Sequence, residues 1–281
     1  MVAAGFPYRS RHSGTRSLAI SGAREYQDRA LNFAHRGALT VAPENTLASF
    51  QKAREMGADG VELDVMLCAD GEVVVSHDFT VERTTDGRGR IAELPLARLK
   101  ALDAGAWFSP LFAGERMPTL REVLAWAGED MLLNIELKSQ SLGTDGVEQK
   151  VISLVREHQM EHRVVLSSFN PLALRRAKQM APDVHTGLLY AGDLPIVFRR
   201  AWLRPLSLAD ALHPQFEMVN ESYLAWARRS GYRVNVWSPT EAAEMQRLVE
   251  LGVDMIITDR PDLLADVLTQ GEPSADPERG K

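Results

Sequence analysis

The sequence is poor in cysteine and in long apolar runs. Cys68 is the only cysteine among 281 residues, so the chain cannot form a disulfide within itself. No run of 18 or more apolar residues occurs, so the sequence offers no candidate transmembrane helix. Both features fit a cytoplasmic protein, which is the location we expect.

An excess of positive charge is also missing. The 32 lysines and arginines are outnumbered by 38 acidic residues, which gives a formal net charge of -6. Residues of both signs are interspersed, and this argues against a nucleic acid or an anionic membrane as partner. The composition does not specify the oligomeric state.

The two ends of the chain differ from the rest. Residues 1–29 contain five arginines and lack the continuous apolar core of a secretory signal. We expect them to form a flexible N-terminal tail, and residues 271–281 a disordered C-terminal tail. The folded domain is therefore predicted to span residues 30–270.

Segments typical of strands and of helices alternate through this domain. Strands are expected at 31–34, 60–67, 73–75, 131–137, 164–166, 186–190, 210–212, 233–237 and 254–258. Amphipathic helices fall between most of them, for example at 46–56, 147–158, 172–180, 223–229 and 240–251. About eight such repeats in about 250 residues predict a TIM (β/α)8 barrel.

Residues 79–118 interrupt this alternation. They contain turn-forming residues and one short helical piece around residues 96–102. Because long structureless loops are uncommon, we expect an ordered insertion that caps the catalytic end of the barrel.

Three predicted strands carry paired side chains two positions apart. The pairs are Glu62 with Asp64, Glu136 with Lys138, and Asn235 with Trp237. Side chains alternate between the two faces of a strand, so the members of a pair point the same way. The residues between them are apolar and are expected to face the surrounding helices, so the pairs should point into the barrel.

Three converging carboxylates would repel one another in a site with little water. A divalent cation bound by Glu62, Asp64 and Glu136 removes this repulsion, and a set of oxygen ligands favours Mg²⁺ or Ca²⁺ over Zn²⁺. The alternative is that the acids form separate ion pairs with Lys138 or other cationic side chains.

Two histidines follow predicted strands close to these acids. His35 comes after the strand at 31–34 and His77 after the extended piece at 73–75. Histidines at adjacent strand ends suit general acid–base catalysis near neutral pH. Alternatively, one of them is a metal ligand or a packing residue. His213 precedes Pro214 at the end of a predicted strand and could reach the rim of the barrel, but it is a weaker candidate.

Short blocks spread over residues 31–268 share a further pattern. They lie at 34–37, 42–46, 57–65, 70–78, 83–85, 118–120, 134–138, 167–170, 236–237, 252–254 and 258–261. Together they resemble the glycerophosphodiester phosphodiesterase family. The match is less clear around His213 and Pro214, and Ser238 and Pro239 depart from the pattern, so contacts with the head group are not carried over.

The resemblance implies a TIM barrel with a small insertion after the early strands. It implies hydrolysis of a small glycerophosphodiester to an alcohol and glycerol 3-phosphate, in lipid and glycerol metabolism. It assigns acid–base catalysis to His35 and His77, and metal binding to Glu62, Asp64 and Glu136. The remaining roles it assigns are phosphate contacts for Arg36 and Lys138, a pocket wall for Trp237, and organisation of the site for Glu44 and Asn45.

Other functions remain open at this point. A lysophospholipase D would share these blocks, and apolar segments at 106–108, 111–112 and 196–198 offer a surface for a lipid. A lyase that forms a Schiff base through Lys138 is a second alternative. A barrel that only binds is disfavoured by the complete set of two histidines and three acids.

Overall fold

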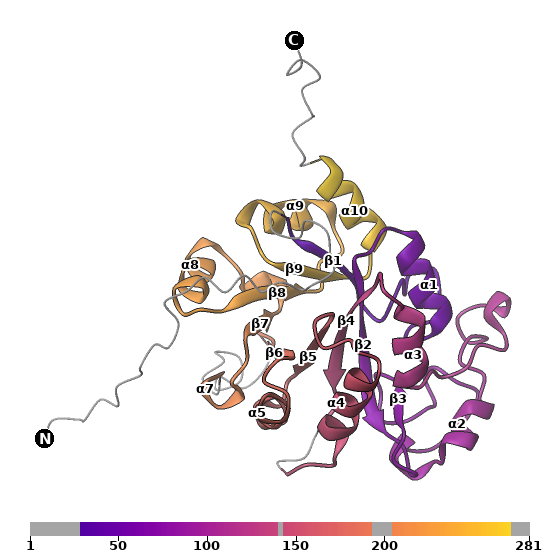
Figure 1. Ribbon diagram of the computed structural model, residues 1–281. Coiled ribbons are helices and arrows are strands. Elements are labelled where there is room, and N and C mark those ends of the chain that lie inside the picture. The colour runs from indigo at the N-terminus through magenta and orange to yellow at the C-terminus, as the bar shows by residue number, and fades with distance from the viewer. Residues whose placement is uncertain (1–28, 140–142, 193–203, 271–281) are drawn as a thin grey trace, which may run out of the picture.

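Eight parallel strands close into a barrel, as the sequence predicts (Figure 1). The computed structural model describes residues 29–139, 143–192 and 204–270. Neighbouring strands follow the order β1-β9-β8-β7-β6-β5-β4-β2, and pairing of β1 with β2 closes the ring. The barrel strands are β1 Leu31–Ala34, β2 Gly60–Leu67, β4 Leu132–Leu137, β5 Val164–Ser168, β6 His185–Tyr190, β7 Ala211–Pro214, β8 Arg233–Trp237 and β9 Met255–Thr258.

Helices surround the barrel and cover its outer face (Figure 1). On β2, Val61, Leu63 and Val65 are fully buried in the layer between strands and helices. The intervening Glu62 and Asp64 consequently point to the inside of the barrel. The helices around the barrel are α1 Leu47–Glu55, α3 Leu120–Ala127, α4 Val147–Glu157, α5 Pro171–Met180, α7 Arg204–Ser207, α8 Glu221–Arg229, α9 Ala242–Leu251 and α10 Pro261–Gln270.

Polar residues at the start of several helices explain why these helices begin where they do. The Thr46 hydroxyl accepts a hydrogen bond from the amide of Ser49 at the start of α1. Thr119 and Glu122 form a reciprocal capping box at the start of α3. Both satisfy backbone amides that the first turn of a helix leaves without a partner.

The third extended piece has a different role from the barrel strands. β3 (Val73–Val75) runs antiparallel to β2 and extends the sheet beyond the ring. Residues 79–118 follow it and contain η1 (Ile91–Glu93), α2 (Leu96–Ala101) and η2 (Pro110–Phe112). Ile91, Leu99 and Met117 from this segment share a small apolar core with Met66 of β2 and Val74 of β3.

The interior of the barrel corrects one expectation from the sequence. His213 is not at the rim but is completely buried, and its Nε2 atom lies 2.8 Å from the side-chain nitrogen of Asn235. Gly187 on β6 makes this position possible, since a Cβ atom there would lie 2.0 Å from Nε2 of His213. Without a glycine at position 187 the imidazole would have no room.

Some expectations concern residues that the structure does not describe. The tails, apart from Arg29, and the apolar segment at 196–198 lie outside the described residues. Within the part of the chain that is described, none of the helices is both long enough and apolar enough to cross a membrane.

Candidate active site

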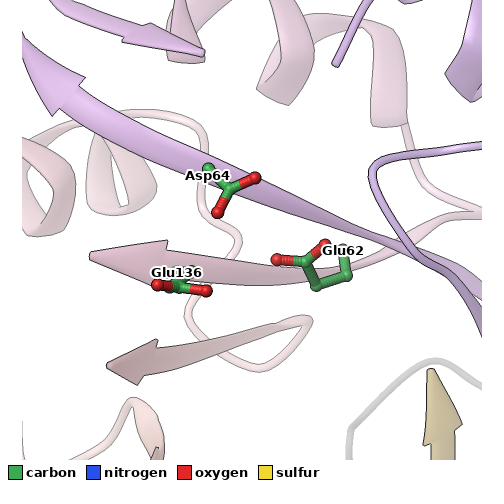
Figure 2. A group of neighbouring side chains, drawn as sticks. All are labelled: Glu62, Asp64 and Glu136. Atoms are coloured by element: carbon green, nitrogen blue, oxygen red, sulfur yellow. The ribbon is translucent and has the colours of Figure 1, made fainter. Parts of the chain in front are cut away.

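The three predicted acidic residues converge at one place inside the barrel. Glu62 and Asp64 lie on β2, and Glu136 lies on β4 directly beside Asp64 in the register of the two strands. One carboxylate oxygen from each lies within 4.8 Å of the others, and Figure 2 shows the three groups facing one another. Glu62 and Asp64, two residues apart on β2, therefore point to the same side, where Glu136 of β4 meets them.

Burial and mutual repulsion perturb these carboxyl groups. Burial, and then the charges of Asp64 and Glu136, raise the pKa of Glu62 well above its usual value. Burial and the charge of Asp64 raise the pKa of Glu136 to about 7. Burial alone would raise the pKa of Asp64 as well, but Lys138 and Arg36 lower it. Ionisation of all three carboxyl groups is therefore unfavourable in the barrel interior unless further positive charge lies beside them.

Two cationic side chains border the cluster. The Lys138 Nζ atom lies 3.1 Å from Glu136 Oε1 and 3.5 Å from Asp64 Oδ1. The Arg36 Nε atom lies 3.6 Å from Asp64 Oδ2. Ion pairs with Lys138 thus exist for two of the acids, but two cationic groups do not neutralise three carboxylates. The all-oxygen donor set and the short separations fit a divalent cation such as Mg²⁺ or Ca²⁺.

His35 is held by a carboxylate from the neighbouring strand end. Its Nδ1 atom lies 2.6 Å from Asp259 Oδ1, and the two residues directly follow β1 and β9. The next backbone amide, that of Arg36, donates to Glu62 Oε2 at 3.0 Å and places His35 beside the acidic cluster. With Nδ1 engaged by Asp259, the Nε2 atom is the one that can face a substrate.

His77 also has a carboxylate partner. Its Nδ1 atom lies 2.7 Å from Asp78 Oδ1. Burial lowers the pKa of His77, and Lys138 and Arg36 lower it further, against the opposing effects of Asp64 and Asp78. Burial would raise the pKa of Asp78, but hydrogen bonds from Arg83 and His77 lower it to about 2. Asp78 is therefore ionised and can orient the imidazole.

Glu44 and Asn45, which were expected to organise the site, contact Arg36 and Asp64. Glu44 Oε1 accepts a hydrogen bond from Arg36 Nη1 at 3.1 Å. The Asn45 side-chain amide donates to Asp64 Oδ2 at 3.0 Å. The loop that carries them turns sharply after His35, with positive φ angles at Arg36, Gly37 and Asn45. A Cβ atom on Gly37 would meet Ser49 Oγ at 1.9 Å, so this turn requires a glycine.

An aromatic pair lies at the same end of the barrel. Trp237 ends β8, and its indole nitrogen donates to the carbonyl of His213 at 2.9 Å. Phe169 follows β5 and packs edge-to-face against Trp237, with ring centroids 5.9 Å apart. Phe169 remains 36% exposed. The sequence indicated Trp237 as a pocket wall but gave no role to Phe169, although Phe169 belongs to the block at 167–170.

The sequence also gave no role to Asp78, Arg83 or Asp259. All three lie in blocks that carry the family resemblance: Asp259 directly follows β9, Asp78 lies three residues after β3, and Arg83 lies near the start of the insertion. Their importance becomes visible only through their partners, because Asp259 meets a histidine that is 224 positions away in the chain.

Comparison with known proteins gives a consistent result. Residues 35–263 match the model of the glycerophosphoryl diester phosphodiesterase family. A glycerophosphodiester phosphodiesterase from Caldanaerobacter subterraneus subsp. tengcongensis is 42% identical over 245 residues, which cover 86% of this chain and 99% of the relative. One from Bacillus subtilis is 33% identical, with 88% of this chain and 89% of the relative covered.

Solved structures show the same likeness. One is a phosphodiesterase from Oleispira antarctica in complex with the product sn-glycerol-3-phosphate. It superimposes on this chain with a TM-score of 0.74 at 33% sequence identity, and the match covers 87% of this chain and 98% of the other. A glycerophosphodiester phosphodiesterase from Agrobacterium tumefaciens gives a TM-score of 0.74 at 30% identity, with 84% and 99% covered.

Proposed function

Because the chain belongs to the glycerophosphoryl diester phosphodiesterase family, we propose that it hydrolyses glycerophosphodiesters to an alcohol and sn-glycerol 3-phosphate with two histidines and a divalent cation. The observation that carries this proposal is that one carboxylate oxygen from each of Glu62, Asp64 and Glu136 lies within 4.8 Å of the others, beside two histidines that each have a carboxylate on Nδ1. The glycerol phosphate found in the Oleispira relative supports the substrate class.

Glu62, Asp64 and Glu136 would hold the cation, Mg²⁺ or Ca²⁺, and the bound cation would supply positive charge that stabilises the reacting phosphate. Lys138 and Arg36 border the same space and add stabilisation of the charge that develops on the phosphate. Neither cationic side chain changes its protonation state, since the nearby carboxylates raise the pKa of both against the effect of burial.

His35 and His77 divide the two proton transfers. One accepts the proton of the attacking hydroxyl, which belongs to water or to the neighbouring glycerol hydroxyl. The other donates a proton to the departing alkoxide, which is otherwise a poor leaving group. Asp259 and Asp78 accept from Nδ1 of their histidine, and this leaves Nε2 of each ring for the reacting oxygens.

The substrate panel that tests this function contains glycerophosphocholine, glycerophosphoethanolamine and glycerophosphoglycerol. We expect glycerol 3-phosphate and the free alcohol from at least one of them in the presence of Mg²⁺ or Ca²⁺. A transient cyclic phosphate among the products would identify the glycerol hydroxyl as the first nucleophile.

One observation favours a second candidate, cleavage of lysophospholipids. In the insertion, Leu111 is 91% exposed and Trp107 is 42% exposed, so this segment presents an apolar surface. Lysophosphatidylcholine assayed beside glycerophosphocholine at equal concentration separates the two functions. Faster release of choline from the lysophospholipid would favour this second candidate.

Lys138 is predicted to bind phosphate and not to act as a nucleophile. Its Nζ atom lies between Glu136 and Asp64, and the pKa of this amine is raised, so it stays protonated. Lys138→Arg should keep the charge but misplace it, and kcat/KM should fall by about 10-fold or more because the guanidinium has a different shape. Treatment with borohydride during turnover should leave the mass of the protein unchanged; a substrate adduct on Lys138 would instead support the Schiff-base lyase.

The Glu136 carboxyl should contribute less stability to the metal-free protein as the pH rises. The unfolded chain releases the proton of Glu136 near pH 4.5, whereas the folded chain holds it to about pH 7. The folded state therefore binds more protons at this group in this range, and the contribution of Glu136 to the free energy of unfolding falls between about pH 5 and pH 8. A bound cation replaces these protons. The rise in Tm that the cation causes should therefore become larger over the same pH range. Thermal melts with and without Mg²⁺ or Ca²⁺ at pH 5.5 and pH 8 measure this, and an increment that shrinks with pH would contradict it.

A further inference from the structure

Arg83 of the insertion contacts two acidic residues that come from separate loops of the barrel. Its Nε atom donates to Asp78 Oδ2 at 2.5 Å. Its two terminal nitrogens donate to the two oxygens of Glu44, each at 2.8 Å. This paired geometry uses the planar shape of the guanidinium, which a lysine cannot reproduce.

These contacts connect the two sides of the proposed active site. Asp78 uses its other oxygen for Nδ1 of His77. Glu44 also accepts from Arg36, whose Nε atom lies 3.6 Å from Asp64. Arg83 therefore lies between the His77 side and the Arg36 side of the site.

Asp78 depends on Arg83 for a fixed orientation. The Asp78 side chain is 30% exposed and belongs to the residue directly after His77, so it can rotate toward solvent. Arg83 fixes one of its oxygens, and Glu44, which is 11% exposed, fixes Arg83 in turn. Asp78 then presents its second oxygen to the imidazole in one direction.

We propose that Arg83 is a positioning residue that holds Asp78 on Nδ1 of His77 and thereby directs Nε2 of His77 toward the reacting oxygen. This inference rests on the proposed function of His77. It explains why the insertion contributes to the site although it carries none of the acids or histidines. Arg83 acts through Asp78 and is not expected to touch the substrate.

The test combines Arg83→Gln with His77→Ala. We expect Arg83→Gln to lower kcat by about 10- to 100-fold, the range typical of a lost orienting contact, with little change in KM. Arg83→Lys should restore part of the loss, because it keeps the charge and can reach one of the two carboxylates. In the His77→Ala background Arg83→Gln should have almost no further effect, since a positioning residue has nothing left to position.

A matched control separates this role from the stability of the insertion. Arg116 donates to the carbonyls of Ala101 and Leu102 within the insertion. Arg116→Gln should change the melting temperature as much as Arg83→Gln or more, yet leave kcat near normal. Nitrogen-15 NMR of His77 gives an independent readout: the wild type should show one tautomer with the proton on Nδ1, and Arg83→Gln should show a mixture.

The outcomes are distinguishable. Equal losses from Arg83→Gln in the wild type and in the His77→Ala background would overturn the positioning role while leaving the proposed function intact. Normal turnover by His77→Ala alone would overturn the proposed function and this inference together. If Arg83→Gln does not fold, Arg83→Lys and the NMR measurement still test the positioning role. Full activity of Arg83→Lys together with an unchanged His77 tautomer would show that the paired hydrogen bonds of Arg83 are not needed.

Discussion

His35→Ala and His77→Ala should each lower kcat on natural glycerophosphodiesters by about 100- to 10,000-fold, the contribution typical of one general acid or base. Both imidazoles are held by a carboxylate on Nδ1, at 2.6 Å for His35 and 2.7 Å for His77, so each presents Nε2 for proton transfer. The double variant should cost less than the product of the two single losses, because groups that act in one step are not additive.

The identity of the leaving group tells the acid from the base. A nitrophenyl ester needs little protonation when it departs, so it should rescue the variant that lacks the acid and not the one that lacks the base. Circular dichroism and thermal melts provide the control that both variants are folded. Near-normal turnover of natural diesters by both single variants would show that the acid–base assignment is wrong.

Removal of the divalent cation should abolish activity, and Glu62→Gln should reproduce much of this loss. Glu62 is 5% exposed, and the pKa of its carboxyl is raised well above the usual value by burial, Asp64 and Glu136. In the metal-free protein the amide resembles the protonated acid, so Glu62→Gln should hardly change the melting temperature. Loss of a residue that supports a metal ligand typically lowers the affinity for the metal by about 10- to 100-fold. Because Glu62 is itself a proposed ligand, Glu62→Gln should lower the affinity for the cation by more than this.

Calorimetric titration of the metal-free protein with Mg²⁺ and with Ca²⁺ measures both affinities. The matched control is Glu148→Gln, which removes a buried carboxylate that pairs with Arg176 away from the site. This control should lose stability because it breaks a buried ion pair, but it should keep its affinity for the cation. Full activity of dialysed wild-type enzyme in excess chelator would contradict the metal dependence.

The barrel and its acidic cluster were predictable because both follow from local periodicity. Repeated strand and helix patterns imply a parallel sheet, and a spacing of two residues puts Glu62 and Asp64 on one face. The direction of β3 was not assigned from the sequence, although the sequence contains it: only residues 68–72 separate β3 from β2, and a parallel pair needs a crossover of about a dozen residues or more. The short return after β2 therefore makes the pair antiparallel.

The partners of the histidines were hidden for a similar reason. Asp259 reaches His35 only because barrel closure brings β9 beside β1. Arg83 reaches Glu44 across 39 positions, from a segment whose sequence shows no regular period. The burial of His213 depends on the missing side chain of Gly187 on the neighbouring strand, and no pattern within β7 reports it.

The most direct test of the proposed reaction is phosphorus NMR of each of the three glycerophosphodiesters of the panel incubated with the purified enzyme. With Mg²⁺ or Ca²⁺ present, the diester signal of at least one of them should be replaced by that of glycerol 3-phosphate, while the free alcohol accumulates in equal amount. The same sample with excess chelator, or with His35→Ala, should keep the diester signal over the same time. Loss of the diester at an unchanged rate in chelator and in the variant would contradict a metal-dependent reaction that uses His35.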